Sequence, residues 1–239
     1  MQLLEELKLS KDEFPTFVSQ TLQKKKYLVL WVVTDCDWMR DAIVRMRYVT
    51  TLMKEGLKVE GRGPCFKKPF SWEKDGKSTT YKFYLALENS RHCKDYITEK
   101  MFTNAFRNNA VPIVWGATKQ DYQDLAPPNS FIYAEDYSPE ELVRYIDYLD
   151  KNNTAYLEYF KWRTMNITDL PMYRRQYGFC QLCRVLNGVN VDNIYNPRYK
   201  ESYSDIPLYG YPTRPRLVKT IKKWFYESEN KACLAPNEY

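Results

Sequence analysis

Residues 82–115 place polar side chains that could bind a phosphorylated sugar directly after an apolar run. These side chains belong to Glu88, Asn89, Tyr96, Glu99 and Lys100. They offer carboxylates, an amide, a hydroxyl and an ammonium group within one short segment. A carboxylate repels phosphate oxygens but accepts hydrogen bonds from sugar hydroxyls. The combination therefore favours a sugar joined to phosphate over a bare phosphate as the ligand.

The residues around this cluster predict one strand–helix–strand unit. An apolar strand over 83–87 leads into the cluster, and a helix begins near residues 96–97 with Thr98 as an early capping hydroxyl. The helix ends at residues 108–109, and residues 111–115 form a second buried strand. Such a unit implies parallel strands joined by a right-handed crossover. Ligands of parallel sheets bind beyond the carboxyl ends of the strands, which is where the cluster begins.

The start of the predicted helix favours an anion, because unpaired backbone amides and the helix dipole both attract negative charge. Lys100 lies in this first turn, where a cation opposes the dipole unless an anion is bound. Glu99 is stabilised there by the dipole alone, so its carboxylate fits a structural role as well as a binding role. The residues by themselves therefore assign Lys100 to phosphate and leave Glu99 open.

Two short motifs then produce a specific resemblance to a known family. Residues 88–90 (ENS) and 95–100 (DYITEK) resemble the F-E-N-S and D-Y-I-T-E-K motifs of the α1,3/4-fucosyltransferases. Leu87 stands where the family has Phe, and the loop at 91–94 is longer by a residue than in the commonest members. The resemblance covers about residues 27–163 and continues more weakly beyond them.

The resemblance implies an α1,3-fucosyltransferase of the inverting GT-B class. In that class L-fucose is transferred from GDP-fucose to the GlcNAc of a glycoprotein N-glycan. Residues 24–186 are then expected to form the Rossmann-like, GDP-fucose-binding half. Glu88 would bind the donor or brace the loop that follows it. In a direct displacement a carboxylate deprotonates the acceptor hydroxyl, and the family places that base on its other domain. No catalytic residue is therefore assigned here.

The resemblance also implies roles for individual residues. It places Arg45, Tyr96 and Lys100 on the donor diphosphate, where a guanidinium binds phosphate oxygens bidentately and stabilises departing GDP. It places Glu99 on the fucose hydroxyls and Asn89 between phosphate and sugar. On the residues alone, Arg45 would belong more simply to a solvated helix face.

Members of the family are usually Golgi enzymes with an N-terminal signal anchor, a stem and two domains. This sequence shows no such anchor and has few residues before Tyr27. We therefore expect part of a longer single-pass protein of the Golgi lumen, attached to the membrane only through that anchor. By itself it should bind GDP-fucose but transfer fucose poorly. The alternative is a non-catalytic nucleotide-sugar-binding module or pseudoenzyme, and the gene sequence upstream of Met1 would distinguish the two.

Composition excludes several other classes of protein. The chain has 239 residues, of which 44% are hydrophobic and 28% charged, so it can bury a core and is not disordered. Its net charge of +6 comes from interspersed basic and acidic residues, which argues for anion binding and against nucleic acid. No apolar run reaches the length of about 18 residues that indicates a membrane span.

The six cysteines fit a protein of the secretory pathway, and their number allows fifteen pairings. Cys180 and Cys183 form a CxxC motif, but a zinc site would need a second such pair. The resemblance instead implies a local disulfide between these two cysteines. Asn152 and Asn166 begin N-glycosylation sequons, which agree with a lumenal location.

Two further features have the residue types of a catalytic or metal site. His92 is the only histidine, but it lies in the loop of variable length and is assigned a structural or solvent-exposed place. Asp35 and Asp37 form a DxD pattern after an apolar strand, a form in which some glycosyltransferases bind a divalent metal. The resembled family has no obligatory metal, so no metal ligand is assigned. Stimulation by Mn²⁺ or Mg²⁺ stays open.

Alternating strands and helices predict an α/β fold with a parallel sheet flanked by helices. Ser138, Pro139 and Glu141 are typical of a helix start with a capping box. Pro15 is expected to break the helical pattern of residues 1–23, a connector or remnant of a preceding domain. Residues 187–239 are expected to form an irregular and partly helical extension. The remaining predicted elements are strands at 27–33, 57–60 and 130–133 and helices at 43–53, 118–125 and 154–163.

Overall fold

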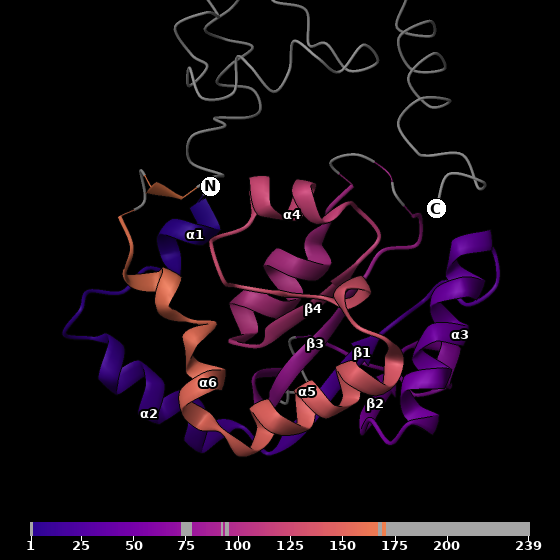
Figure 1. Cartoon of the computed structure of the whole chain (residues 1–239), viewed down its shortest axis with the longest axis horizontal. Coiled ribbons are helices and arrows are strands. Elements are labelled where there is room, and N and C mark those ends of the chain that lie inside the picture. The colour runs from indigo at the N-terminus through magenta and orange to yellow at the C-terminus, as the bar shows by residue number, and fades with distance from the viewer. Residues whose placement is uncertain (1, 73–77, 92, 94–95, 167–168, 171–239) are drawn as a thin grey trace, which may run out of the picture.

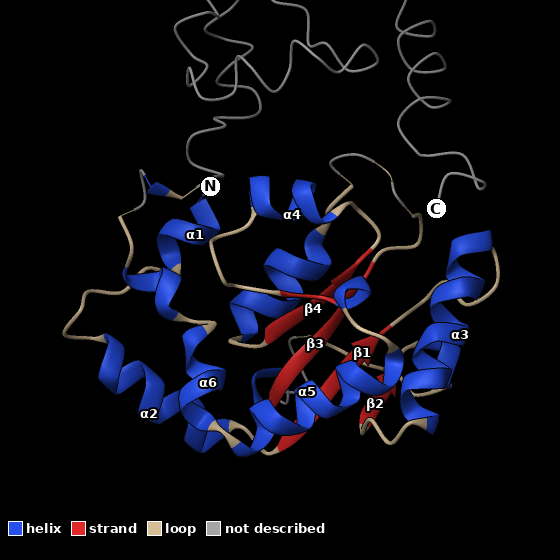
Figure 2. Cartoon of the chain, in the orientation of Figure 1, coloured by secondary structure: helices blue, strands red, loops and turns tan. Residues whose placement is uncertain are grey.

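The computed structural model describes residues 2–72, 78–91, 93, 96–166 and 169–170. A five-stranded parallel sheet with the order β2-β1-β3-β4-β5 forms its centre, and helices cover both faces (Figures 1 and 2). This arrangement confirms the predicted α/β fold with a parallel sheet. The strands are β1 (Tyr27–Val32), β2 (Val59–Arg62), β3 (Tyr81–Leu87), β4 (Val111–Trp115) and β5 (Ile132–Tyr133).

The helices connect these strands in sequence order. The α-helices are α1 (Gln2–Glu6), α2 (Phe14–Lys24), α3 (Arg40–Lys54), α4 (Lys119–Leu125), α5 (Pro139–Lys151) and α6 (Asn153–Glu158). A π-helix, η3 (Lys100–Ala105), continues into the 3₁₀ turn η4 (Phe106–Asn108). The other 3₁₀ turns are η1 (Pro64–Phe66), η2 (Ser78–Thr80), η5 (Ala134–Asp136) and η6 (Lys161–Thr164).

The sheet separates two hydrophobic cores, because successive side chains of a strand point to opposite faces. In β3, Phe83 and Leu85 pack on the side covered by α3, α5 and α6. Tyr84 and Ala86 pack on the side that holds Met101 of η3 and parts of α1 and α4. With apolar residues on both faces, the strand is buried along its length, as parallel strands generally are.

The strand order creates one topological switch point, between β1 and β3. From β1 the chain continues to β2 on one side, whereas β3 leads to β4 and β5 on the other side. The helices that follow, α3 and η3, pack on opposite faces of the sheet. Where the connections diverge in this way, a crevice is expected between the carboxyl ends of the two strands, here β1 and β3. Sheets of this kind bind ligands at such a point. The residues Asp35, Arg45 and Glu88 belong to the segments that follow these two strands.

Local sequence signals located most elements correctly, and several boundaries differ. Ser138 caps α5 with the predicted capping box, and Thr118 caps α4 in the same way. Pro15 does not break a helix: it lies in the first turn of α2, where proline is tolerated because its missing N–H has no helical partner. The strand predicted at 57–60 lies at β2, two residues later. The helix predicted over 154–163 is divided between α6 and η6.

The helix after β3 begins later than predicted. Residues 96–98 are not helical, and the π-helix η3 starts at Lys100 with Glu99 as its N-cap residue. Thr98 does not cap this helix. Its amide and hydroxyl both donate hydrogen bonds to the Glu88 carboxylate, at 2.9 Å each, and this contact holds the segment away from helical geometry.

A disulfide joins Cys36, after β1, to Cys65, after β2, and thus ties two neighbouring loops at the carboxyl end of the sheet. Cys93 is also disulfide-bonded. The predicted Cys180–Cys183 pair and the extension at 187–239 lie outside the described residues. None of the described helices is both long and apolar enough to cross a membrane.

Candidate functional site

The carboxylate of Glu88 is the centre of the polar cluster at the switch point. Glu88 follows β3 directly and is only 1% exposed. Its carboxylate accepts hydrogen bonds from the Thr98 amide and hydroxyl at 2.9 Å each and from the Lys100 ammonium at 2.7 Å. A buried carboxylate is stable only with such partners. The start of the helical segment, where an external anion was expected, is therefore already in contact with an anion of the protein itself.

Gly116 permits Glu88 to lie this deep. The Glu88 amide donates to the Trp115 carbonyl at 2.9 Å, which continues the pairing of β3 with β4. A β-carbon at Gly116 would lie 2.5 Å from the Glu88 β-carbon, closer than such atoms approach. Gly116 also has φ of +129°, which side chains other than glycine rarely adopt. No sequence motif drew attention to Gly116, although a glycine directly after a buried strand was a visible signal.

The Lys100 ammonium is the most accessible cation of this cluster, with 20% of its side chain exposed. It donates to Glu88 and to the Thr98 hydroxyl, at 2.7 Å each. Glu99, whose side chain is 62% exposed, lies 3.6 Å from the same nitrogen. The Lys100 ammonium is therefore held by the protein groups of Glu88 and Thr98, with Glu99 beside it.

Asn89 and Tyr96 form a second contact beside this cluster. The Tyr96 hydroxyl donates to the Asn89 side-chain oxygen at 2.7 Å, and the Asn89 amide group lies 3.6 Å from the Met39 sulfur. Burial raises the pKa of Tyr96, and the negative charge of Glu88 adds to the rise. The Tyr96 hydroxyl is therefore protonated at neutral pH and can donate to a ligand only by giving up Asn89.

Arg45 connects the ends of the two strands at the switch point. Its guanidinium donates to the carbonyl of Leu87 at 2.9 Å and to that of Asp35 at 2.8 Å, so it links the ends of β3 and β1. Arg45 is 3% exposed, and burial lowers its pKa although Asp35 and Glu88 oppose the change. The loop after β3 is fixed to α3 as well, because Asp41 accepts the Arg91 amide at 2.7 Å. Because they donate to the carbonyls of Leu87 and Asp35, both terminal nitrogens of Arg45 already bind the backbone.

The aspartates of the DxD pattern lie in the loop after β1. The Asp35 carboxylate accepts the amide of Trp38 at 3.1 Å, and the Trp38 side chain is 91% exposed. Within the described part of the chain, no three His, Cys, Asp or Glu residues gather as metal ligands would. His92 lies outside the described residues.

Thr98 is the residue of this site that sequence reasoning placed wrongly. Its side chain contacts both Glu88 and Lys100, whereas its position in the motif suggested a helix cap. The only signal in the sequence was that Thr98 lies between Glu88 and Lys100 along the chain. That order alone does not show which of the three side chains are in contact.

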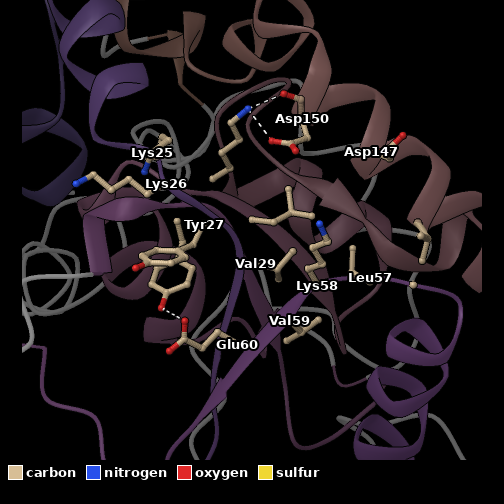
Figure 3. Close-up of a pocket in the computed structure, with 15 residues that line it drawn as sticks. Lys25, Lys26, Tyr27, Val29, Leu57, Lys58, Val59, Glu60, Asp147 and Asp150 are labelled. Atoms are coloured by element: carbon tan, nitrogen blue, oxygen red, sulfur yellow. Dashed lines mark hydrogen bonds and ion pairs between the residues drawn. The ribbon is translucent and has the colours of Figure 1, made fainter.

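A groove of about 650 Å³ opens at the opposite, amino-terminal end of the sheet (Figure 3). It lies between the start of β1, β2 and β3 and the end of α5, where Lys82 forms an ion pair with Asp150. Lys25 contributes to its wall and donates to the carbonyls of Thr79 and Asn108 at 2.9 and 3.2 Å. Burial lowers the pKa of Lys25 to about 7, and the nearby charges of Arg163 and Lys24 add to the effect.

Lys25 should make the stability of the protein rise with pH. Between about pH 7 and pH 10 the unfolded chain holds a proton on Lys25 that the folded chain has released, so raising the pH favours folding. We expect the free energy of unfolding to increase by about 1 kcal/mol per pH unit from pH 7 to pH 9, measured by urea titration. Lys25→Met should remove this slope. A flat profile for the unmodified chain over that range would contradict the prediction.

A family model and individual curated proteins that match this sequence are all fucosyltransferases. The family model described as glycosyltransferase family 10 (fucosyltransferase) C-term matches residues 22–201. A 4-galactosyl-N-acetylglucosaminide 3-alpha-L-fucosyltransferase 9 of Cricetulus griseus is 41% identical over 170 residues, 70% of this chain and 45% of that protein. A 3-galactosyl-N-acetylglucosaminide 4-alpha-L-fucosyltransferase of Homo sapiens is 41% identical over 150 residues, 62% of this chain and 40% of that protein. The chain thus spans less than half the length of these relatives.

Solved structures support the fold. An α1,3-fucosyltransferase with GDP-fucose aligns with a TM-score of 0.54 at 21% identity, over 78% of this chain and 54% of that chain. An α1,3-fucosyltransferase with GDP aligns with a TM-score of 0.56 at 22% identity, over 75% of this chain and 52% of that chain. At such identities the likeness concerns the arrangement of strands and helices.

Proposed function

Because the chain belongs to glycosyltransferase family 10, the fucosyltransferases, we propose that it binds GDP-fucose at the crevice between β1 and β3. The observation that supports this most directly is the cluster of Asn89, Tyr96, Glu99 and Lys100 at the carboxyl end of β3. All four residues come from the two motifs that resemble the family, and none of the four is fully buried. Glu88 and Arg45, both buried, act from behind this surface.

The proposed division of roles follows from charge and exposure. The Lys100 ammonium contacts the diphosphate, which carries negative charge that increases as GDP departs. The exposed Glu99 carboxylate accepts fucose hydroxyls and stabilises positive charge at the anomeric carbon. Tyr96 and Asn89 exchange their mutual hydrogen bond for bonds to phosphate and sugar. Arg45 affects the diphosphate by its charge and by holding the two strand ends, since its terminal nitrogens already bind carbonyls.

The reaction proposed for the whole protein is the inverting transfer of L-fucose to O3 of a GlcNAc in a glycoprotein glycan. The anomeric carbon bonds to the acceptor oxygen as its bond to the GDP oxygen breaks. A base must take the acceptor proton. We assign no such base among the described residues, and the acceptor is proposed from the names of the relatives.

We propose a lumenal location in the Golgi, the compartment that the resemblance to the family implies. The Cys36–Cys65 disulfide supports it, because structural disulfides persist in the secretory pathway and are rare in the cytosol. Asn152, the first predicted glycosylation site, accepts the Ala155 amide as the cap of α6 and keeps its amide nitrogen near the surface, 3.1 Å from the Tyr148 hydroxyl. A glycan on that nitrogen would leave the cap oxygen in place.

We propose no metal as an obligatory cofactor. Asp35 uses its carboxylate on a backbone amide, and the charge of the diphosphate is compensated by Lys100 and Arg45 in this proposal. Fucosyl transfer measured with EDTA and then with added Mn²⁺ or Mg²⁺ would show whether a divalent ion stimulates the reaction.

Calorimetry with GDP-fucose tests the donor site. We expect Lys100→Ala to weaken binding by about tenfold or more, the scale of one hydrogen bond to a charged group. Lys151→Ala is the matched control, since Lys151 is an exposed lysine at the end of α5 that pairs with Asp147. It should change the affinity by less than about twofold.

Loss of Lys100 also leaves the Glu88 carboxylate without its ammonium partner, so the fold of the variant has to be checked by circular dichroism. A folded Lys100→Ala protein that binds GDP-fucose as tightly as the unmodified chain would refute the proposed site. Binding without transfer to a GlcNAc acceptor, in the longest native form of the protein, would favour the non-catalytic alternative.

A further inference from the structure

The Lys100 ammonium has a fixed orientation in this structure. An ammonium group has three N–H donors, and Lys100 uses one on Glu88 and one on the Thr98 hydroxyl, at 2.7 Å each. The tetrahedral geometry of the nitrogen then directs the remaining N–H along a single line. Glu99 lies 3.6 Å away, beyond the distance of a good hydrogen bond, and the side chain of Lys100 is 20% exposed. One donor is therefore left for a ligand.

Thr98 holds the second of these anchors, and its own orientation is fixed by Glu88. The hydroxyl of Thr98 can donate its single hydrogen only to the Glu88 carboxylate, whose oxygens lie 2.9 and 3.0 Å away. Its lone pairs then face the ammonium. The Thr98 amide donates to the same carboxylate at 2.9 Å, so both the backbone and the side chain of Thr98 are fixed to Glu88. The side chains of Glu88, Thr98 and Lys100 are thus each hydrogen-bonded to the other two.

We propose that Thr98 is a positioning residue for the donor diphosphate, acting through Lys100. The proposal rests on the proposed function, since it assumes that Lys100 contacts a phosphate oxygen. Thr98 touches no ligand itself. Its hydroxyl, oriented by buried Glu88, prevents the Lys100 ammonium from rotating and leaves one N–H in a fixed direction for the ligand.

This arrangement changes what Lys100 offers to a ligand. A lysine on a flexible stem acts as a mobile point charge and loses conformational entropy when it binds phosphate. A lysine already fixed at two N–H groups has lost that freedom on folding, so binding costs less. The anion must then fit the direction of one N–H group. Glu88 offsets part of the charge of Lys100, so the direction of the free N–H group adds to the remaining charge in the recognition of the diphosphate.

The test compares two substitutions at Thr98 by calorimetry with GDP. Thr98→Val keeps the shape and removes the hydroxyl, whereas Thr98→Ser keeps the hydroxyl. We expect Thr98→Val to weaken GDP binding by about five- to tenfold and Thr98→Ser by less than about twofold. In a Lys100→Met background, Thr98→Val should have no additional effect, because its partner is gone. Melting temperatures establish that all variants are folded.

A ligand-free measurement separates this proposal from the proposed function. The ¹⁵N signal of the Lys100 ammonium should be protected from exchange in the unmodified chain and in Thr98→Ser, and lost in Thr98→Val. If the unmodified chain does not bind GDP, the proposed function fails, and the ammonium signal alone still decides whether Thr98 orients Lys100. Equal GDP binding by Thr98→Val and the unmodified chain, or the same loss in the Lys100→Met background, would overturn the inference.

Discussion

Gly116→Ala is expected to abolish most donor binding while also destabilising the fold. The new β-carbon would lie 2.5 Å from the β-carbon of Glu88 and 3.1 Å from the carbonyl oxygen of Ser90. Glu88 would have to move, and its contacts to Thr98 and Lys100 would be lost with it. We expect GDP-fucose affinity to fall by at least about tenfold and the free energy of unfolding by about 2–4 kcal/mol.

Gly56→Ala is the matched control for this substitution. Gly56 has a similar positive φ, +104°, but an added β-carbon there would meet no atom within 4 Å. Backbone strain alone should cost about 1–2 kcal/mol of stability and leave donor affinity unchanged. Urea unfolding and calorimetry on both variants separate strain from displacement of Glu88. Equal affinities for Gly116→Ala and Gly56→Ala would show that Glu88 can move without consequence.

Arg163→Leu is expected to cause a loss of stability as large as that of Gly116→Ala, without a direct contact to the Glu88 cluster. Arg163 is 3% exposed and donates to the Phe106 carbonyl and the Asn109 side chain, at 2.9 Å each. A longer contact of 3.5 Å reaches the carbonyl of Leu7. The guanidinium also lies 4.7 Å from the centre of the Phe17 ring. It thereby joins segments that are distant in sequence.

Leucine would fill part of the space but remove the hydrogen bonds of the guanidinium, at about 1–3 kcal/mol each. The Phe106 carbonyl would keep the Asn109 amide as a donor, at 3.1 Å. Burial lowers the pKa of Arg163 to about 10, so removing the cation recovers part of its desolvation cost. We expect a net loss of about 3 kcal/mol in the free energy of unfolding. Arg107→Leu, at an exposed arginine paired with Glu6, should cost less than about 0.5 kcal/mol. An Arg163→Leu protein as stable as the unmodified chain would mean that desolvation cancels every contact.

Elements with strong local signals were predictable from the sequence. The apolar runs of β1, β3 and β4 and the capping box at Ser138 lie where the residues indicated. Their positions depend on neighbouring residues in the chain, which a sequence displays directly. The start of η3 was predicted too early for the opposite reason. It depends on the contact between Thr98 and Glu88, which the fold alone creates.

The membership of the candidate site was predictable, but its internal contacts were not. Glu88, Asn89, Tyr96 and Lys100 do meet at the end of β3, since the motifs follow one strand. The motifs did not show that Lys100 binds Glu88, or that Arg45 uses its terminal nitrogens on backbone carbonyls. Such partners are chosen by three-dimensional packing. A charged residue in a motif can serve the ligand, the scaffold or both, and its type does not distinguish these roles.

The π-helix η3 determines which of its side chains face Glu88 and which face the hydrophobic core. A π-turn holds one residue more than an α-turn and is often found at functional sites. In Lys100–Ala105 this wider turn allows Lys100 to face Glu88 while Met101 and Ala105 stay buried against β3. Deleting one residue here would remove the wider turn and change which side chains face Glu88 and which face β3. The segment should therefore tolerate substitutions far better than changes in length.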